Sequence, residues 1–434
     1  MFFKPIYILI LGGTIVIDYF VGIYLEKFSG AQKKLLLIVS IIANVGVLAV
    51  FKYYNFFIEN TNGFLSLSNH QLQFPYLNIL LPIGLSFHTF QAMSYTIEVY
   101  RGRQKPEKHF GIYALYVMFY PQLVAGPIER PQHMLHQFHE KKAFNESNLA
   151  YGLKLMLWGF FKKIFVADRL AVYVGTAYSG YTHETGSTLL LATFFFAIQI
   201  YCDFSGYSDI ARGAAKTMGY DLMINFRRPY LAGNISDFWR RWHVSLSTWF
   251  RDFVYFPLGG NHTNTLKWCF NLMIVFLLSG IWHGANYTFV FWGFLHGSFV
   301  VVHKLSQRWH TGNQKKLYPY GAFKFAGIVF NFALVTFAWI FFRAENMQQA
   351  WDIIKKIFTN INGELYFKTT TWMLVSLAGI FIVLMADIFE EYGLNVQLLH
   401  HKHLAVRLIT VSTIIISILL FGTLRNTSFI YFQF

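Results

Sequence analysis

Cysteine and charged residues are both scarce in this sequence. The two cysteines, Cys202 and Cys269, lie in apolar stretches and provide neither a disulfide framework nor the paired spacing of a metal site. Only 13% of the 434 residues are charged and 55% are hydrophobic, whereas soluble domains carry about 25% charged residues. The composition therefore excludes an ordinary soluble domain and predicts an integral membrane protein.

Several sequence signatures of enzymes are also missing. The chain has no G-x-S-x-G elbow, no Walker loop and no dinucleotide fingerprint. Although the net charge is +15, no compact basic module indicates nucleic-acid binding. Neither an internal repeat nor a long linker interrupts the chain, so we expect a single membrane domain over residues 1–434.

Apolar stretches long enough to cross a bilayer recur along the chain. They predict an all-α membrane protein with about ten or eleven transmembrane helices, some re-entrant, near residues 5–25, 35–58, 79–99, 110–128, 150–166, 187–202, 268–282, 286–303, 322–342, 371–386 and 405–422. Lysine and arginine cluster after several of these stretches, which indicates cytoplasmic loops or contact with anionic lipid or donor phosphates. The first stretch has no small-residue cleavage site and predicts a signal anchor.

Residues 268–303 contain no Asp, Glu, Lys or Arg but hold His283 between two glycines. As one helix this stretch would extend roughly 54 Å, whereas the hydrocarbon core of a bilayer is only about 30 Å thick. We therefore expect the helix to break near His283. An imidazole there costs free energy unless it is hydrated or paired, so we expect His283 to face a water-connected passage and regard it as the first functional candidate.

Residues 236–256 carry an apolar stripe at helical spacing, with polar residues on another face. The stripe predicts one amphipathic helix, capped by Asn234 or Ser236, that lines a funnel or lies at the membrane interface. A surface helix anchored in lipid is the alternative. The stripe consists of Phe238, Trp242, Leu246, Trp249, Phe253 and Phe256, and the polar face of Arg240, His243, Ser247 and Arg251.

His283 and His243 are the best candidates for proton transfer, because the pKa of histidine lies near physiological pH. A buried structural histidine is the alternative for each. We expect structural or interfacial roles for His296 and His303. No carboxylate in good register completes a metal site, so we predict no metal at the remaining histidines with helical spacing, which are His133, His136 and His139.

Several long motifs resemble the membrane-bound O-acyltransferase (MBOAT) family. The similarity is to the bacterial branch with the membrane subunits of alginate and peptidoglycan O-acetylation and of teichoic-acid D-alanylation. The motifs are PIGLSFHTFQAMSYTIEVYRG (82–102), PQLVAGPIERP (121–131), DFSGYSDIARG (203–213), NFRRPYLAGNISDFWRRWHVSLSTWFRDFVYFPLGG (225–260), SGIWHGANYTFVFWG (279–293) and FIYFQF (429–434). By comparison with that family we expect one further apolar segment upstream, so that either this helix is absent here or the start of the sequence is trimmed.

The resemblance implies a ring of tilted helices around a central funnel, with His283 at the catalytic position and His243 as a second functional histidine. It also implies an O-acyltransferase of the bacterial inner membrane that uses acetyl-CoA or another acyl thioester as a donor and holds no permanent cofactor. We expect membrane lipid around it, an extracytoplasmic acetyltransferase partner and a polysaccharide acceptor such as an alginate-like exopolysaccharide or peptidoglycan. Arg240, Arg241 and Arg251 are candidates for contacting the donor phosphates, and interfacial anchoring is the alternative for each.

Three alternatives stay open from the sequence. Transfer of D-alanine from a carrier protein to teichoic acid is the alternative within the family. A polytopic transporter would also place histidines at broken helices in mid-membrane, and a scaffold without catalysis would recruit extracytoplasmic enzymes. Tyr431, near the carboxyl terminus, is a candidate acyl relay, and anchoring in an interfacial aromatic belt is its alternative reading.

Overall fold

The computed structural model describes residues 7–68, 72–79, 82, 84–123, 126–310, 322–366, 369–394 and 398–423. All regular secondary structure in these ranges is helical, which confirms the prediction of an all-α protein. Eight of the helices are long and apolar enough to cross a bilayer, judged by length and composition. The chain is therefore a multi-pass membrane protein.

The eight long helices coincide with eight of the eleven stretches expected from the sequence. They are α1 (Tyr7–Lys27), α2 (Gly30–Leu67), α9 (Gly186–Thr217), α12 (Thr265–His283), α13 (Tyr287–His310), α14 (Ala322–Arg343), α16 (Thr370–Glu391) and α17 (Leu404–Phe421). The other three stretches form helices of 16, 9 and 15 residues, which are α3 (Leu85–Tyr100), α4 (Phe110–Met118) and α7 (Glu146–Phe160). Of these, α3 and α4 are shorter than the roughly 20 residues that a spanning helix needs. The helix α7 continues without a break through the π-helical residues 161–167 and on to Ser179.

Contacts between residues divide the chain into two compact units. The first unit comprises residues 1–149 and 214–223, and the second comprises residues 150–213 and 224–434. The first also contains α5 (Tyr120–Leu123) and α6 (Pro131–His139). The second contains, besides its long helices, η1 (Phe161–Ala167), α8 (Asp168–Ser179), η2 (Pro229–Leu231), α10 (Ile235–Arg241), α11 (Val244–Phe250), η3 (Arg251–Tyr255), α15 (Met347–Thr359) and η4 (Leu398–His400). A single domain and a ring around a funnel stay predictions.

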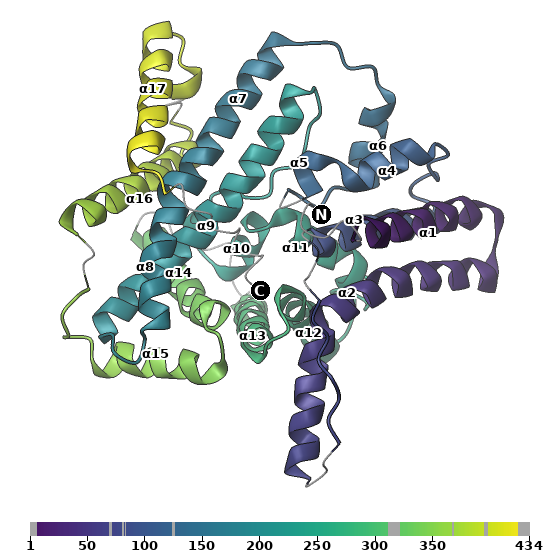
Figure 1. Ribbon diagram of the computed structural model, residues 1–434, viewed down its shortest axis with the longest axis horizontal. Coiled ribbons are helices and arrows are strands. Elements are labelled where there is room, and N and C mark those ends of the chain that lie inside the picture. The colour runs from purple at the N-terminus through teal and green to yellow at the C-terminus, as the bar shows by residue number, and fades with distance from the viewer. Residues whose placement is uncertain are drawn as a thin grey trace. The chain divides into compact units, whose positions relative to one another are not determined.

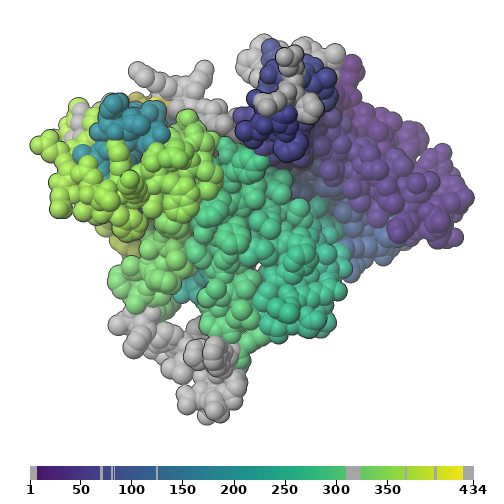
Figure 2. Space-filling view, turned by 90° about the horizontal axis from the view of Figure 1, so that it is seen from below, coloured from purple at the N-terminus to yellow at the C-terminus, as the bar shows by residue number. Residues whose placement is uncertain are grey.

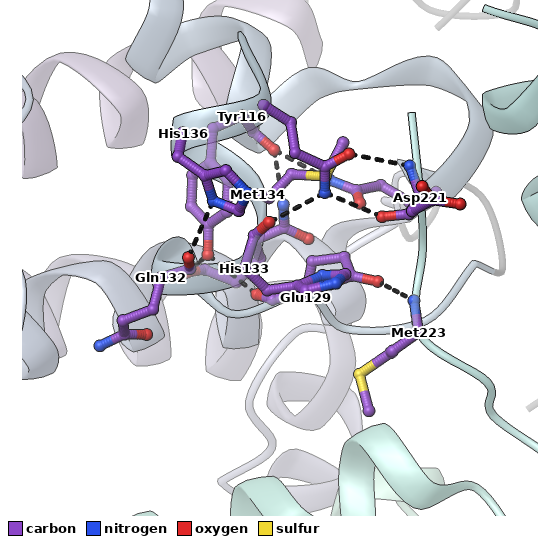
Figure 3. A network of polar contacts seen from close by, with 11 residues as sticks. Tyr116, Glu129, Gln132, His133, Met134, His136, Asp221 and Met223 are labelled. Atoms are coloured by element: carbon purple, nitrogen blue, oxygen red, sulfur yellow. Dashed lines mark hydrogen bonds and ion pairs between the residues drawn. The ribbon is translucent and has the colours of Figure 1, made fainter. Parts of the chain in front are cut away.

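A buried carboxylate organises the polar core of the first unit (Figure 3). Glu129 is fully buried, and its two carboxylate oxygens lie 2.6 Å from the Met223 N–H and 2.7 Å from Nδ1 of His133. The Tyr116 hydroxyl donates a hydrogen bond of 2.9 Å to the Glu129 carbonyl. The hydrogen bond that His133 donates to the Glu129 carboxylate raises the pKa of His133, since the charged imidazolium is favoured beside a carboxylate. His139 pairs with a different carboxylate, Glu107, at 2.7 Å.

Close backbone contact and buried charge join the helices of the second unit. Figure 1 shows α7 and α9 running side by side, and a Cβ added at Gly159 of α7 would lie 2.7 Å from the carbonyl oxygen of Gly206 in α9. One turn further, Lys163 lies 2.7 Å from both Asp168 and Asp203. The two carboxylates offset the cost of burying the ammonium group of Lys163, and the ion pair with Asp203 holds the residues after α7 against α9.

The apolar stretch around His283 folds into two helices, α12 and α13, as predicted. The break falls at Gly284, whose backbone is extended, and α13 begins at Tyr287. The two helices then pack tightly, because a Cβ added at Gly280 would lie 2.3 Å from the Phe289 carbonyl oxygen. Their residues, teal-green to green, form one continuous surface in the centre of Figure 2. The packing of α12 against α13 therefore fixes the position of His283, the last residue of α12.

Replacement of Gly280 by alanine tests this contact. We expect Gly280→Ala to lower the free energy of unfolding by at least about 2 kcal/mol, because the added methyl group meets a backbone carbonyl that cannot rotate away. Gly175→Ala is the matched control, since an added Cβ there meets nothing within 4 Å and alanine favours the helix by up to about 1 kcal/mol. Thermal unfolding in detergent micelles measures the stability of both variants. Equal melting temperatures would show that the close approach of Gly280 to the Phe289 carbonyl does not limit the stability of the protein.

Candidate active site

His243 lies at a break between two short helices rather than within one. The continuous helix predicted over residues 236–256 is wrong: α10 ends at Arg241, α11 begins at Val244, and η3 follows from Arg251. The reason is that residues 225–227 form hydrogen bonds with the backbone at the break. The N–H of Val244 donates to the Asn225 carbonyl, and the N–H of Arg227 donates to the Arg241 carbonyl, each at 2.9 Å. The predicted cap is confirmed at Asn234, whose side chain accepts from the Asp237 N–H.

The backbone of His243 is strained. Its φ of 43° is in the left-handed region, which only one other non-glycine residue of the described chain, Arg228, occupies. A left-handed backbone costs an ordinary residue roughly 1–2 kcal/mol. Strain of this kind persists where the surrounding structure determines the position, and it often occurs at functional sites.

Asn225 determines the protonation of the His243 ring. The Oδ1 atom of Asn225 accepts hydrogen bonds from the Ser245 N–H at 3.1 Å and the Ser245 hydroxyl at 3.0 Å, so this atom is an acceptor. It also lies 3.2 Å from Nδ1 of His243, which must therefore donate. The proton of the neutral ring is thus on Nδ1, and Nε2 carries the lone pair. Burial lowers the pKa of His243 to about 3, so the ring is neutral at pH 7.

His283 is the last residue of α12 and lies among aromatic rings. Its ring centroid is 4.8 Å from that of Trp282 and 5.1 Å from those of Trp292 and Phe342. Only 4% of the residue is exposed. The structure therefore holds His283 among aromatic rings, because the close α12–α13 packing brings Trp292 against the imidazole. The water-connected passage expected from the sequence stays a prediction.

One indole lies next to both candidate histidines. The ring of Trp282 is 6.2 Å from the ring of His243 and 4.8 Å from the ring of His283. On its other side, His243 meets the ring of Phe204, whose centroid is 4.6 Å away. The two histidines, 40 positions apart in sequence, thus come together in the second unit around a shared aromatic wall.

The three candidate arginines have different surroundings. Arg241 pairs with Asp237 and with Glu391, each at 2.9 Å. Burial opposes its charge, but these carboxylates more than offset that effect and raise the pKa of Arg241, which indicates a structural role. Arg240 is 71% exposed in its side chain and only 3.3 Å from Asp237, and Arg251 pairs with Asp252 at 2.8 Å. Arg240 is therefore the most accessible of the three.

Two further sequence candidates need placing. His296, one turn beyond Trp292 on α13, is fully buried, with its ring 4.8 Å from that of Trp292. Tyr431 lies outside the described residues. Sequence reasoning missed Asn225 and Trp292, because nothing in their local pattern shows that their side chains meet His243 and His283 across a break between helices.

Comparison with known proteins gives these residues a context. The model of the MBOAT, membrane-bound O-acyltransferase family matches residues 109–348, which is more than half of the chain and includes His243 and His283. The chain belongs to the membrane-bound O-acyltransferase family. Membership confirms the predicted class, an O-acyltransferase, at the level of the family.

Similar proteins of this family come from several bacteria. A protein named probable alginate O-acetylase AlgI, from Pseudomonas aeruginosa, is 37% identical over 81% of this chain and 66% of its own length. A peptidoglycan O-acetyltransferase from Helicobacter pylori is 36% identical over 83% of this chain and 72% of its own length. A teichoic acid D-alanyltransferase from Bacillus subtilis is 29% identical over 56% and 64%. The chain thus spans about two thirds of the length of these relatives.

Substitution of Asn225 tests the orientation of His243. We expect Asn225→Asp to raise the pKa of His243, since a carboxylate beside Nδ1 stabilises the imidazolium. The pH below which the rate of acyl transfer falls should then move to a higher value, because the ring of this variant takes up a proton at a higher pH. Asn225→Ala, which removes the acceptor, should reduce turnover about 10–100-fold with little change in KM. An unchanged profile in Asn225→Asp would contradict the assigned tautomer.

Proposed function

We propose that this chain transfers an acetyl group from a cytoplasmic thioester, such as acetyl-CoA, for attachment to a hydroxyl of an extracytoplasmic polysaccharide. An alginate-like exopolysaccharide or peptidoglycan is the acceptor that the names of two similar relatives favour. The observation that carries the proposal is the convergence of two buried imidazoles on Trp282, with the proton of one fixed by Asn225. The family match places both histidines within the matched region.

His283 is the general base of the proposed reaction. Its ring takes the proton of the attacking hydroxyl, the oxygen forms a bond to the thioester carbonyl carbon, and the carbon–sulfur bond breaks. The proton then passes from His283 to the leaving thiolate, so that the free thiol and the ester are the products. The aromatic surrounding of His283 excludes bulk water and strengthens these electrostatic effects by lowering the local dielectric.

His243 has a different part in this proposal. Burial holds its ring neutral, and the proton on Nδ1 is directed to Asn225. A ring in this state accepts a hydrogen bond at Nε2 but does not protonate a leaving group. We therefore assign His243 to orient an N–H or O–H group of a substrate, and we leave protonation of the thiolate to His283.

The cellular setting follows from the same proposal. The protein lies in the bacterial inner membrane, receives the donor from the cytoplasm and works with an extracytoplasmic acetyltransferase partner. Transfer of D-alanine to teichoic acid is the weaker candidate, because the relative with that activity in its name is less similar than the two O-acetylating ones. A transporter would bind a substrate without consuming a thioester, which separates it from the proposed enzyme.

Release of thiol in proteoliposomes tests the proposal. We expect the purified chain to release free coenzyme A from acetyl-CoA in the presence of polysaccharide acceptor, and His283→Ala to reduce the rate at least about 10²-fold through loss of the base. His262→Ala is the control, since His262 is exposed in a turn of the same unit. Mass spectrometry of the polymer should show the acetyl ester disappear with His283→Ala. Full modification by that variant would reject an enzymatic role for His283.

The proposed relay at Tyr431 has its own test. Tyr431→Phe keeps the aromatic ring but removes the hydroxyl that would carry the acyl group. If Tyr431 relays the group, this variant should abolish polymer acetylation in cells, because the hydroxyl that accepts the acyl group is gone. Unchanged polymer acetylation would leave Tyr431 as an interfacial anchor.

A further inference from the structure

A second buried carboxylate of the first unit lies in the middle of α1. Asp18 and its two side-chain neighbours on α2, Ser40 and Asn44, are each at most 1% exposed. The Ser40 hydroxyl lies 2.6 Å from Oδ1 of Asp18, and Nδ2 of Asn44 donates a hydrogen bond of 2.7 Å to Oδ2. The helix α1 is apolar and long enough to cross a bilayer. Carboxylates are rare in such helices because they are costly to bury, and those that occur there often have a function.

The charge of Asp18 is not compensated by a basic side chain. Among the residues that the structure describes, only Ser40 and Asn44 stabilise its negative charge, and no lysine, arginine or histidine pairs with it. Hydrogen bonds from these neutral groups leave one net negative charge in place. A charge buried in this way requires either a proton or a cation.

The acceptor atoms around Asp18 outnumber the donors. Ser40 has a single hydroxyl proton, but its oxygen lies within hydrogen-bond distance of both Asp18 and Oγ1 of Thr96, the latter at 3.0 Å. The Thr96 hydroxyl donates to backbone carbonyls of its own helix, α3. Nδ2 of Asn44 also donates to the Ser40 carbonyl, which orients the amide, and Oδ1 of Asn44 is buried without a hydrogen-bond partner in the described part of the chain. Two acceptors are therefore left without a donor.

This set of atoms favours a small monovalent cation. A proton on Asp18 would supply one donor and leave one acceptor unsatisfied, whereas a metal ion contacts several oxygens at once. One carboxylate, two hydroxyls and an amide oxygen are ligands that hard cations prefer. A single carboxylate balances one positive charge and leaves a divalent ion with an excess. Oxygens that lie 2.6 and 3.0 Å from one another close around a small ion, which favours Na⁺ over K⁺.

We propose that Asp18, Ser40, Asn44 and Thr96 form a binding site for one Na⁺ ion between α1, α2 and α3. The carboxylate supplies the charge, and the amide oxygen and the two hydroxyl oxygens complete the set of protein ligands. The three helices pack against one another, so the bound ion stabilises the fold of the first unit. The site goes beyond the proposed acyl transfer, because all four ligands belong to the first unit and both candidate histidines belong to the second.

Polar groups connect this site with an exposed part of the same unit. Tyr95 lies close enough to Asp18 to feel its charge, and an added Cβ at Gly22 of α1 would lie 2.7 Å from its hydroxyl. The same hydroxyl accepts a hydrogen bond of 2.8 Å from the Glu107 N–H. The Glu107 carboxylate pairs with His139, whose side chain is 52% exposed. The cation enters along this line of polar groups.

The melting temperature of the full chain in detergent micelles tests the proposal. The probes are sodium, potassium and choline chloride at equal ionic strength. We expect Na⁺ at about a hundredfold excess over its dissociation constant to raise the melting temperature by at least about 3 °C, with saturation, and K⁺ and choline to have no such effect. Asp18→Asn, which removes the charge but keeps the shape of the side chain, should abolish the response. Glu59→Gln, which removes an exposed carboxylate from α2, is the control and should respond like the wild type.

Asn44→Asp tests the assigned ligands by a gain of binding. This substitution places a second carboxylate at the position of the amide oxygen, so Ca²⁺ should stabilise the variant and leave the wild type unchanged. Absence of a Ca²⁺ effect in the variant would contradict the place of Asn44 among the ligands.

The wild type decides the proposal even if a variant does not fold. Equal melting temperatures in the three salts would mean that only water or a proton occupies the position, and would overturn the proposal. A wild type that responds to pH but not to Na⁺ identifies the occupant as a proton, with the same consequence. If Asp18→Asn folds and keeps the Na⁺ response, the ion binds elsewhere and the assignment of Asp18 is wrong.

Discussion

The amide oxygen of Asn225 holds three donors at once, and the geometry around His243 depends on it. Ser245 supplies two of them and the imidazole supplies the third. Because the Val244 N–H donates to the Asn225 carbonyl as well, the same residue also stabilises the break that gives His243 its left-handed backbone. One buried amide therefore fixes the position of the ring, its tautomer and the start of α11.

A buried ion pair lies next to the residues that contact His243. Lys163 bridges Asp168 and Asp203, and Asp203 is followed by Phe204, whose ring contacts His243. In a protein with so few charged residues, an ion pair of this kind is costly to bury and positions its neighbours closely when both partners are present. On the opposite side, contact between α12 and α13 at Gly280 places Trp282 and His283. The two histidines are thus held by different devices, a hydrogen-bonded amide for one and helix packing for the other.

The sequence could predict the features that depend on length and composition. The eight long helices, the break near His283 and the cap at Asn234 follow from apolar length, glycine and capping chemistry. The continuous helix over 236–256 could not be corrected from periodicity, because the bonds that interrupt it come from residues 225–227. The structural role of Arg241 was equally hidden, since its carboxylate partner Glu391 lies 150 positions further along the chain. Local patterns therefore identified the two candidate histidines, whereas their orientation depends on distant partners.

Glu391 has a mechanical consequence. A single carboxylate oxygen at the end of α16 accepts hydrogen bonds from Nε of Arg228 and from Nη1 of Arg241, each at 2.9 Å. Arg228 directly precedes η2, and Arg241 is the last residue of α10, two positions ahead of His243. A sliding motion of α16 along its axis would pull both arginines in the same direction and tilt the imidazole with them. Bilayer thickness, which sets the depth at which such a helix rests, would in this way affect the orientation of the imidazole of His243.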